Sequence, residues 1–94
     1  MNLKLSSKYK KEHKRIFSSG YRTKQRKTAL VHALNRLLEN KPLESKYRDH
    51  VLINEYEGHR ECHIEPDLLL IYFIDLENEL IELARIGSHS ELFK

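Results

Sequence analysis

The sequence has little of several residue types, and each shortage narrows the possible classes of protein. Its 94 residues include one cysteine, no tryptophan, three glycines and two prolines. The single Cys62 excludes an intrachain disulfide and a zinc site of the CxxC kind. With 39% hydrophobic residues and so little glycine and proline, the composition is typical of a globular protein rather than a disordered one.

Long apolar segments are also missing. The longest unbroken apolar run, at 68–74, has seven residues, whereas a helix needs ~20 to span a bilayer. The N-terminal stretch "MNLKLSSKYKKEHK" lacks the apolar segment of a signal peptide. We therefore expect one folded domain over residues 1–94, located in the reducing cytoplasm.

The charge is distributed unevenly along the chain. Residues 1–49 carry 14 Lys and Arg against 4 Asp and Glu, a net charge of +10. Residues 50–94 carry 3 against 10, a net charge of −7. A basic half on a small domain favours binding to a polyanion such as nucleic acid. Two helices with solvated basic faces explain the same counts equally well.

The periodicity of apolar residues predicts an α+β fold. The expected elements are a strand at 2–5, helices at 7–19 and 23–39, and strands at 51–56, 59–65, 68–75 and 79–86. Gly20 and Asn40 suit the left-handed position after the two helices. The helices should pack on one face of a small, mostly antiparallel sheet. His13 falls in the apolar stripe of the first helix and is read as a packing residue, whereas His32 falls off the second stripe and should face solvent.

Alternation along the strands assigns side chains to the two faces of the sheet. In the strand at 59–65, the helix-covered face should hold Arg60, Cys62 and Ile64, and the open face should hold Glu61, His63 and Glu65. A solvated face is the default interpretation of the two glutamates. In the last strand, Arg85 should share a face with Ile81 and Leu83. At the C-terminus, the capping-box pattern from Ser88 to Glu91 predicts a short helical turn that begins at His89.

Several of these residues fit the chemistry of RNA cleavage without a metal. The 2′-hydroxyl must lose a proton to a base, the 5′-oxygen must gain one from an acid, and a cation should stabilise the charge on phosphorus. Residue types with these properties occur at His50, His63, Asp67, Arg85 and His89. Zinc bound by His63 and Asp67 with His50 or His89 is an alternative, although no HExxH or HxxxH pair is expected on one helix and these positions fall on strand ends and a loop. Nucleophilic catalysis by Cys62 is disfavoured, because alternation turns its thiol inward.

Four motifs extend this interpretation. The stretches "YRDH" (47–50), "RECHIEPD" (60–67), "LLIY" (69–72) and "RIGSHSELF" (85–93), in this order, resemble the YafQ branch of the RelE/ParE toxin superfamily. The resemblance implies a RelE-like α+β fold and a type II toxin that cuts mRNA, typically on the ribosome, without metal or cofactor. A cognate antitoxin would hold it inactive.

The resemblance also implies roles for individual residues. The catalytic positions match His50, His63, Asp67 and His89, and the positions that contact the scissile phosphate and the RNA match Arg85 and Phe93. By analogy, His89 is the general acid, and Asp67, assisted by His50 or His63, is on the base side. Many relatives have tryptophan directly after the aspartate, where this chain has Leu68. That ring would stack on a base, an interaction that contributes ~1–3 kcal/mol.

Two other functions are compatible with the sequence. A ParE-like toxin would act by binding a protein target such as a topoisomerase, which does not need several titratable groups in these segments. A non-catalytic RNA-binding module would use the basic half of the chain and would show salt-dependent RNA affinity without strand scission.

Overall fold

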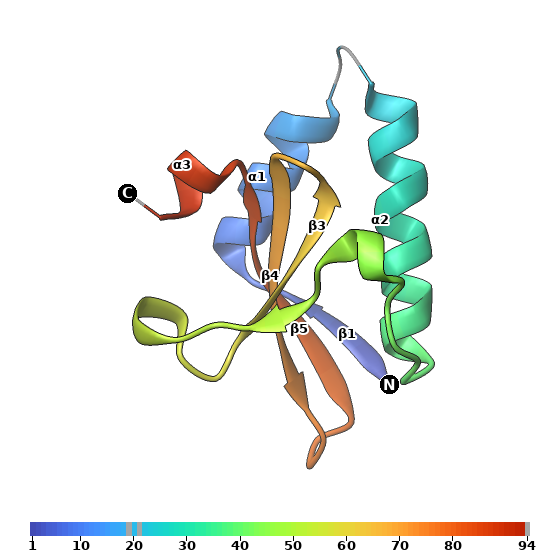
Figure 1. Cartoon of the computed structure of the whole chain (residues 1–94), viewed down its shortest axis with the longest axis vertical. Coiled ribbons are helices and arrows are strands. Elements are labelled where there is room, and N and C mark those ends of the chain that lie inside the picture. The colour runs from blue at the N-terminus through green and yellow to red at the C-terminus, as the bar shows by residue number, and fades with distance from the viewer. Residues whose placement is uncertain (19, 21, 94) are drawn as a thin grey trace.

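The structure, a computed structural model, describes residues 1–18, 20 and 22–93. In chain order, the elements are β1 (Asn2–Leu5), α1 (Ser7–Phe17), α2 (Thr23–Leu38), η1 (Ser45–Tyr47), β2 (His50–Val51), η2 (Asn54–Tyr56), β3 (Arg60–Glu65), β4 (Leu68–Asp75), β5 (Leu80–Gly87) and α3 (His89–Leu92). The five strands form one sheet in the order β1-β5-β4-β3-β2 (Figure 1). The β1–β5 pair is parallel and the others are antiparallel, which confirms the predicted α+β fold.

Both long helices begin and end close to the predicted residues. Ser6 caps α1, because its hydroxyl accepts a hydrogen bond from the Tyr9 amide at 3.0 Å. The helix ends at Phe17, and the predicted end at Ser19 lies outside the described residues. Gly20 (φ +110°) and Asn40 (φ 58°) take the left-handed conformation expected after the two helices.

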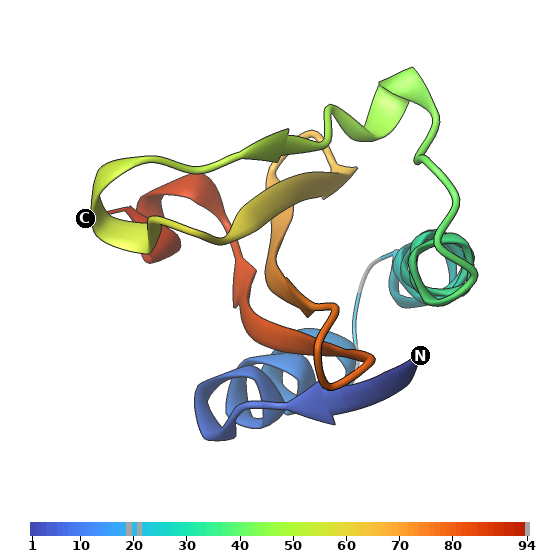
Figure 2. The ribbon, with the colours of Figure 1, turned by 90° about the horizontal axis from the view of Figure 1, so that it is seen from below.

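The main core lies between the two long helices and one face of the sheet, as predicted. Figure 2 shows α2 on one side of the sheet and α3 on the other. Each layer contributes buried side chains to this core. They include Tyr9 and Phe17 of α1, Leu30, Ala33 and Leu37 of α2, and Cys62, Leu70, Tyr72 and Leu83 of the sheet.

The opposite face of the sheet is not open, contrary to the prediction. Leu69 and Ile71 of β4 are buried there under Leu92 of α3. Leu52, Tyr56, Ala84 and Phe93 pack around them as partly buried neighbours. We call this set the second cluster. It covers part of the face with a short helix and a loop, so side chains on this face lie at the edge of a small apolar patch.

The predicted strand at 51–56 is largely wrong. Only His50 and Val51 pair with β3, opposite Glu61 and Arg60. Asn54 has φ 64°, which a strand does not accommodate, and the segment continues as the single turn η2. Of the apolar residues that suggested a strand, Leu52 and Tyr56 pack in the second cluster, whereas Val51 and Ile53 are exposed.

Two bulges change which face some side chains occupy. The β3–β4 register shifts between His63 and Glu65, so that Glu65 lies opposite the core residue Leu68. The β4–β5 register shifts between Ile71 and Tyr72, which lie opposite Arg85 and Leu83. An extra residue in one strand reverses the alternation beyond it. Glu65 therefore lies on the helix-covered face, and Arg85 lies on the other, which corrects both predictions.

Candidate active site

Two rows of side chains cross the face of the sheet that carries α3. Residues opposite one another in neighbouring strands point to the same face, and neighbouring strands lie about 4.8 Å apart. The first row is His50, Glu61, Ile71 and Arg85, and the second is His63, Leu69 and Gly87. The sheet thus places two predicted histidines and the predicted arginine on one face, with the arginine three strands from His50.

A buried carboxylate joins the two histidines. Glu61 is only 5% exposed, and its Oε1 lies 3.4 Å from His50 Nε2 and 3.6 Å from His63 Nε2. The two imidazole centroids are 6.5 Å apart. An ionised carboxylate can only accept hydrogen bonds, so Glu61 faces both Nε2 atoms as an acceptor. The expected solvated face at Glu61 is wrong: its carboxylate is the buried centre of this cluster.

The backbone fixes which imidazole nitrogen is available for proton transfer. His50 Nδ1 lies 2.6 Å from the Arg48 carbonyl, and His63 Nδ1 lies 3.3 Å from the Pro66 carbonyl. Since a carbonyl oxygen can only accept, Nδ1 carries the hydrogen in both rings. Nε2 is therefore the nitrogen without a hydrogen in each neutral ring, and in both rings it faces Glu61.

The loop before His50 is anchored to the core. Asp49 accepts a hydrogen bond from Arg60 Nη2 at 3.1 Å and another from the Tyr72 hydroxyl. Burial, and next the hydrogen bond to Asp49, raise the pKa of Tyr72, so the hydroxyl stays a donor. The aspartate of the "YRDH" stretch thus sets the position of the histidine that follows it.

Asp67 and His89 meet at the start of α3. Asp67 Oδ1 accepts a hydrogen bond from the backbone amide of His89 at 3.0 Å. The predicted capping box is present, with the Glu91 amide donating to the Ser88 hydroxyl and the Ser88 amide to the Glu91 carboxylate. That contact with the Ser88 amide, the largest cause, holds the pKa of Glu91 below its ordinary value. The capped turn keeps His89 beside the β3–β4 turn that carries Asp67.

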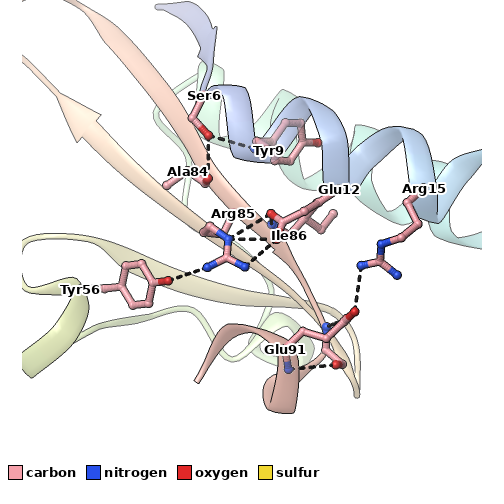
Figure 3. Close-up of polar contacts among 10 residues, drawn as sticks. Ser6, Tyr9, Glu12, Arg15, Tyr56, Ala84, Arg85, Ile86 and Glu91 are labelled. Carbon is pink, nitrogen blue, oxygen red and sulfur yellow. Dashed lines mark hydrogen bonds and ion pairs between the residues drawn. The ribbon is translucent and has the colours of Figure 1, made fainter. Parts of the chain in front are cut away.

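Arg85 is held from two directions (Figure 3). Its Nε and Nη2 donate to the carboxylate of Glu12 in α1, at 3.0 and 2.6 Å from Oε2. Its Nη1 donates to the Tyr56 hydroxyl at 2.9 Å. The hydrogen bond to Glu12 is the main reason that the pKa of Arg85 is raised, so the guanidinium remains charged.

Aromatic contacts link the arginine to the C-terminal turn. The Tyr56 and Phe93 rings meet edge to face at 5.8 Å, and Phe93 lies 5.0 Å from the His89 ring. Arg85 is thus connected to His89 through Tyr56 and Phe93 rather than by a direct contact. Phe93 is partly buried against the second cluster, so its ring has both a packed and an accessible side.

Glu65 does not belong to this site. It accepts hydrogen bonds from Arg22 and Arg26 on the helix-covered side, each at 2.9 Å. Burial opposes its ionisation, but these hydrogen bonds outweigh burial and lower the pKa of its carboxyl. The bulge after His63 explains this placement. Simple alternation could not reveal it, since no sequence signal marks the extra residue.

Three residues of the site were not predicted as functional from the sequence. Glu61 was assigned to a solvated face, Tyr56 to a strand, and Glu12 only to the first helix. In the sheet, Glu61 lies opposite His50 and two residues before His63. The sequence could indicate this position only if the register between β2 and β3 were known. Glu12 and Arg85 are 73 residues apart in sequence, and no local pattern links them.

The surroundings of the site are basic on one side. A groove of about 290 Å³ adjoins His63 and is also lined by Lys46, Tyr47 and Arg48. The groove thus places two cationic side chains near His63, with Glu65 also in its lining. Within residues 1–18, 20 and 22–93, no cluster of three or more His, Cys, Asp or Glu is arranged to hold a metal ion. No helix of the described chain is long and apolar enough to cross a membrane.

Comparisons with known proteins show which family the chain belongs to. Residues 1–94 match the family model described as "Bacterial toxin of type II toxin-antitoxin system, YafQ". The chain is 42% identical over 52 residues to the mRNA interferase toxin YafQ of Escherichia coli K12, covering 55% of this chain and 54% of that protein. A curated YafQ toxin of Haemophilus influenzae is 41% identical over 63 residues, or 62% of its length. The matched segments thus span between half and two thirds of these relatives.

Solved structures match over nearly the whole chain. A metal-bound toxin from Helicobacter pylori has a TM-score of 0.86 at 38% identity, with 99% of each chain covered. A mutant of YafQ from E. coli has a TM-score of 0.83 at 29% identity, and YafQ in the E. coli DinJ–YafQ complex has 0.81 at 29%; each match covers 99% of this chain and 98% of the other. The fold is therefore that of RelE-like bacterial toxins. Within that class, the chain belongs to the YafQ family of type II toxin–antitoxin systems.

Proposed function

We propose that the protein is an mRNA endoribonuclease and the toxin of a type II toxin–antitoxin pair. The observation that carries the proposal is the arrangement on one sheet face: two histidines that share a buried carboxylate, an aspartate joined to a third histidine, and a held arginine. The E. coli relatives, named mRNA interferase toxins, support the same activity. A pure binding protein has no need for three histidines on this face.

The proposed reaction begins with proton removal from a 2′-hydroxyl. Asp67, assisted by the Nε2 of His50 or His63, takes this proton, and the 2′-oxygen attacks phosphorus. His89 protonates the departing 5′-oxygen, and Arg85 stabilises the charge that develops on the phosphate. The products are a 2′,3′-cyclic phosphate and a 5′-hydroxyl end. Phe93 lies next to His89 and supplies a ring against which a base of the RNA can pack.

The buried Glu61 has a supporting role in this proposal. Its carboxylate attracts the positive charge that either imidazole carries after taking a proton in the reaction, because opposite charges in a partly buried site attract strongly. His63 is 17% exposed and His50 is 49% exposed at the side chain. The half-exposed His50 is therefore open to solvent, whereas His63 is largely shielded from it.

Purified protein incubated with a defined mRNA, free and on ribosomes, tests the proposed function. The fragments should carry 5′-hydroxyl ends, and an RNA with a 2′-deoxy sugar at the cleavage position should resist, because it lacks the nucleophile. His63→Ala should lose activity. The matched control, His32→Ala, removes an exposed histidine of α2 that pairs with Glu44 and should keep activity. Fragments with 5′-phosphate ends, or intact RNA together with inhibited supercoiling, would refute the proposal.

The partners follow from the same proposal. An antitoxin encoded nearby would bind the chain, as in the solved DinJ–YafQ complexes of E. coli. The substrate would be mRNA, and the reaction would take place in the cytoplasm, where mRNA is translated. Co-expression of the neighbouring small gene should restore growth of cells that produce the protein. Growth inhibition that persists with the neighbouring protein present would exclude it as the antitoxin.

A further inference from the structure

The contact between α1 and Arg85 has a geometry that simple surface pairing does not require. Glu12 and Arg85 are both largely buried, with side chains 16% and 18% exposed. Glu12 Oε2 accepts from both Nε and Nη2 of the guanidinium (Figure 3). A side-on contact of this kind fixes the plane of the guanidinium as well as its position.

The remaining donors of Arg85 are suited to a phosphate. A guanidinium has five N–H groups. Glu12 takes the Nε–H and one on Nη2, and Tyr56 takes one on Nη1. Two N–H groups are left, one on each terminal nitrogen. Phosphate oxygens can accept hydrogen bonds from both of these groups.

Glu12 also has a structural contact, which must be separated from any role in function. Its Oε1 accepts a hydrogen bond from the Ile86 amide at 3.1 Å. β1 ends at Leu5, and Ser6 donates hydrogen bonds to the Leu83 and Ala84 carbonyls. Beyond them β1 no longer pairs with β5, and Glu12 supplies the acceptor for the Ile86 amide at this edge. A residue that only completes the sheet edge would need this contact and not the side-on contact to Arg85.

We propose that Glu12 is a positioning residue for the reaction: it orients Arg85 so that the two free N–H groups face the scissile phosphate. This inference rests on the proposed endoribonuclease function. Glu12 itself does not touch the RNA. It acts through the guanidinium and couples the first helix to the strand that carries Arg85.

The variant Glu12→Gln separates the two contacts. The amide oxygen of glutamine can still accept from the Ile86 amide and from Arg85 Nε, which lies 3.2 Å from Oε1. The NH₂ group that replaces Oε2 cannot accept from Nη2, so the second half of the contact to Arg85 is lost. We expect kcat for cleavage of a ribosome-bound mRNA to fall about tenfold to a hundredfold, as for other small misplacements of a catalytic group. KM should change by less than about threefold, because the lost interaction matters mainly in the transition state.

The matched control is Glu82→Gln, which makes the same chemical change on β5. Glu82 pairs with the exposed Lys4 at 3.8 Å and has no contact with Arg85. This variant should cleave at the wild-type rate. Because Glu12 acts through Arg85, the double variant Glu12→Gln/Arg85→Ala should be no slower than Arg85→Ala alone. The Arg85 Nε–H signal in ¹⁵N NMR of the free protein should be protected from exchange in the wild type and exchange faster in Glu12→Gln, which keeps only the longer contact to Oε1.

Each contrary result has a distinct meaning. Wild-type or faster cleavage by Glu12→Gln would overturn the inference and leave the proposed function in place, since the carboxylate would then only complete the sheet edge or compete with phosphate. Additive losses in the double variant would also overturn it, because Glu12 would act independently of Arg85. No cleavage by the wild-type protein would overturn the proposed function and the inference with it.

Discussion

Asp67 can contribute to activity in two ways that substitution can separate. Its Oδ1 accepts a hydrogen bond from the His89 amide at 3.0 Å, which ties α3 to the β3–β4 turn. Its carboxylate is also the proposed base. Asparagine keeps an oxygen that accepts the amide hydrogen bond but does not take up a proton. Alanine removes both the acceptor and the base.

The magnitudes of these effects differ widely. A hydrogen bond at the surface contributes about 0.5–1.5 kcal/mol, and a negative charge at the start of a helix adds about 0.3–1 kcal/mol. Because α3 has a single turn, we expect Asp67→Ala to lower the free energy of unfolding by about 1 kcal/mol, or about 4–8 °C in Tm. Asp67→Asn should lose less than half of that. Loss of a general base reduces the rate about 10²- to 10⁴-fold in either variant.

Thermal unfolding followed by circular dichroism, together with single-turnover cleavage, measures both effects on the same samples. We expect both variants to stay folded at 37 °C and to be nearly inactive. If Asp67→Asn cleaves at the wild-type rate while Asp67→Ala does not, Asp67 serves only to hold α3, and its role as a base is refuted. Unfolding of both variants at 37 °C would show that we have underestimated the contact to α3.

Three further predictions follow from the burial and pairing of individual groups. Glu61→Gln should slow cleavage at least about tenfold with a small change in Tm, because an uncharged amide attracts a positively charged imidazole less strongly than a carboxylate does; a wild-type rate would exclude the supporting role of Glu61. The contacts with Arg22 and Arg26 outweigh burial and hold the folded-state pKa of Glu65 below 4.5. The folded state therefore binds fewer protons than the unfolded state. The stability that this group contributes above pH 4.5 is lost as the pH falls through the folded-state pKa. Urea unfolding of Glu65→Gln should therefore depend less on pH in this acid range than that of the wild type, and identical profiles would contradict the pairing. Burial, the largest cause, raises the pKa of the fully buried Cys62 thiol, so iodoacetamide should label it in urea but not in the native protein, and rapid native labelling would contradict its burial.

Much of the fold could be predicted because local signals agree with it. Ser6, Gly20 and Asn40 mark the helix ends, and the period of apolar residues changes from helix to strand near residue 50. The continuous apolar run became the central strand β4, with residues 68–72 buried. Alternation also placed Cys62 and Ile64 in the main core.

The rest depended on contacts that local patterns do not contain. Bulges in β3 and β5 moved Glu65 and Arg85 to faces opposite those predicted, because one extra residue reverses the alternation. The segment after Val51 has the composition of a strand but packs as a turn against the second cluster. The partners of Arg85 include a residue of α1 more than 70 positions away, so only the tertiary structure reveals them.

Mapping of transcript 5′ ends in cells that produce the protein, with its antitoxin absent, tests the central claim most directly. The proposed function predicts new 5′-hydroxyl ends within coding sequences and arrested growth, both absent when His63 is replaced by alanine and both present with His32→Ala. Arrested growth with intact transcripts, or new ends that persist in His63→Ala, would contradict it.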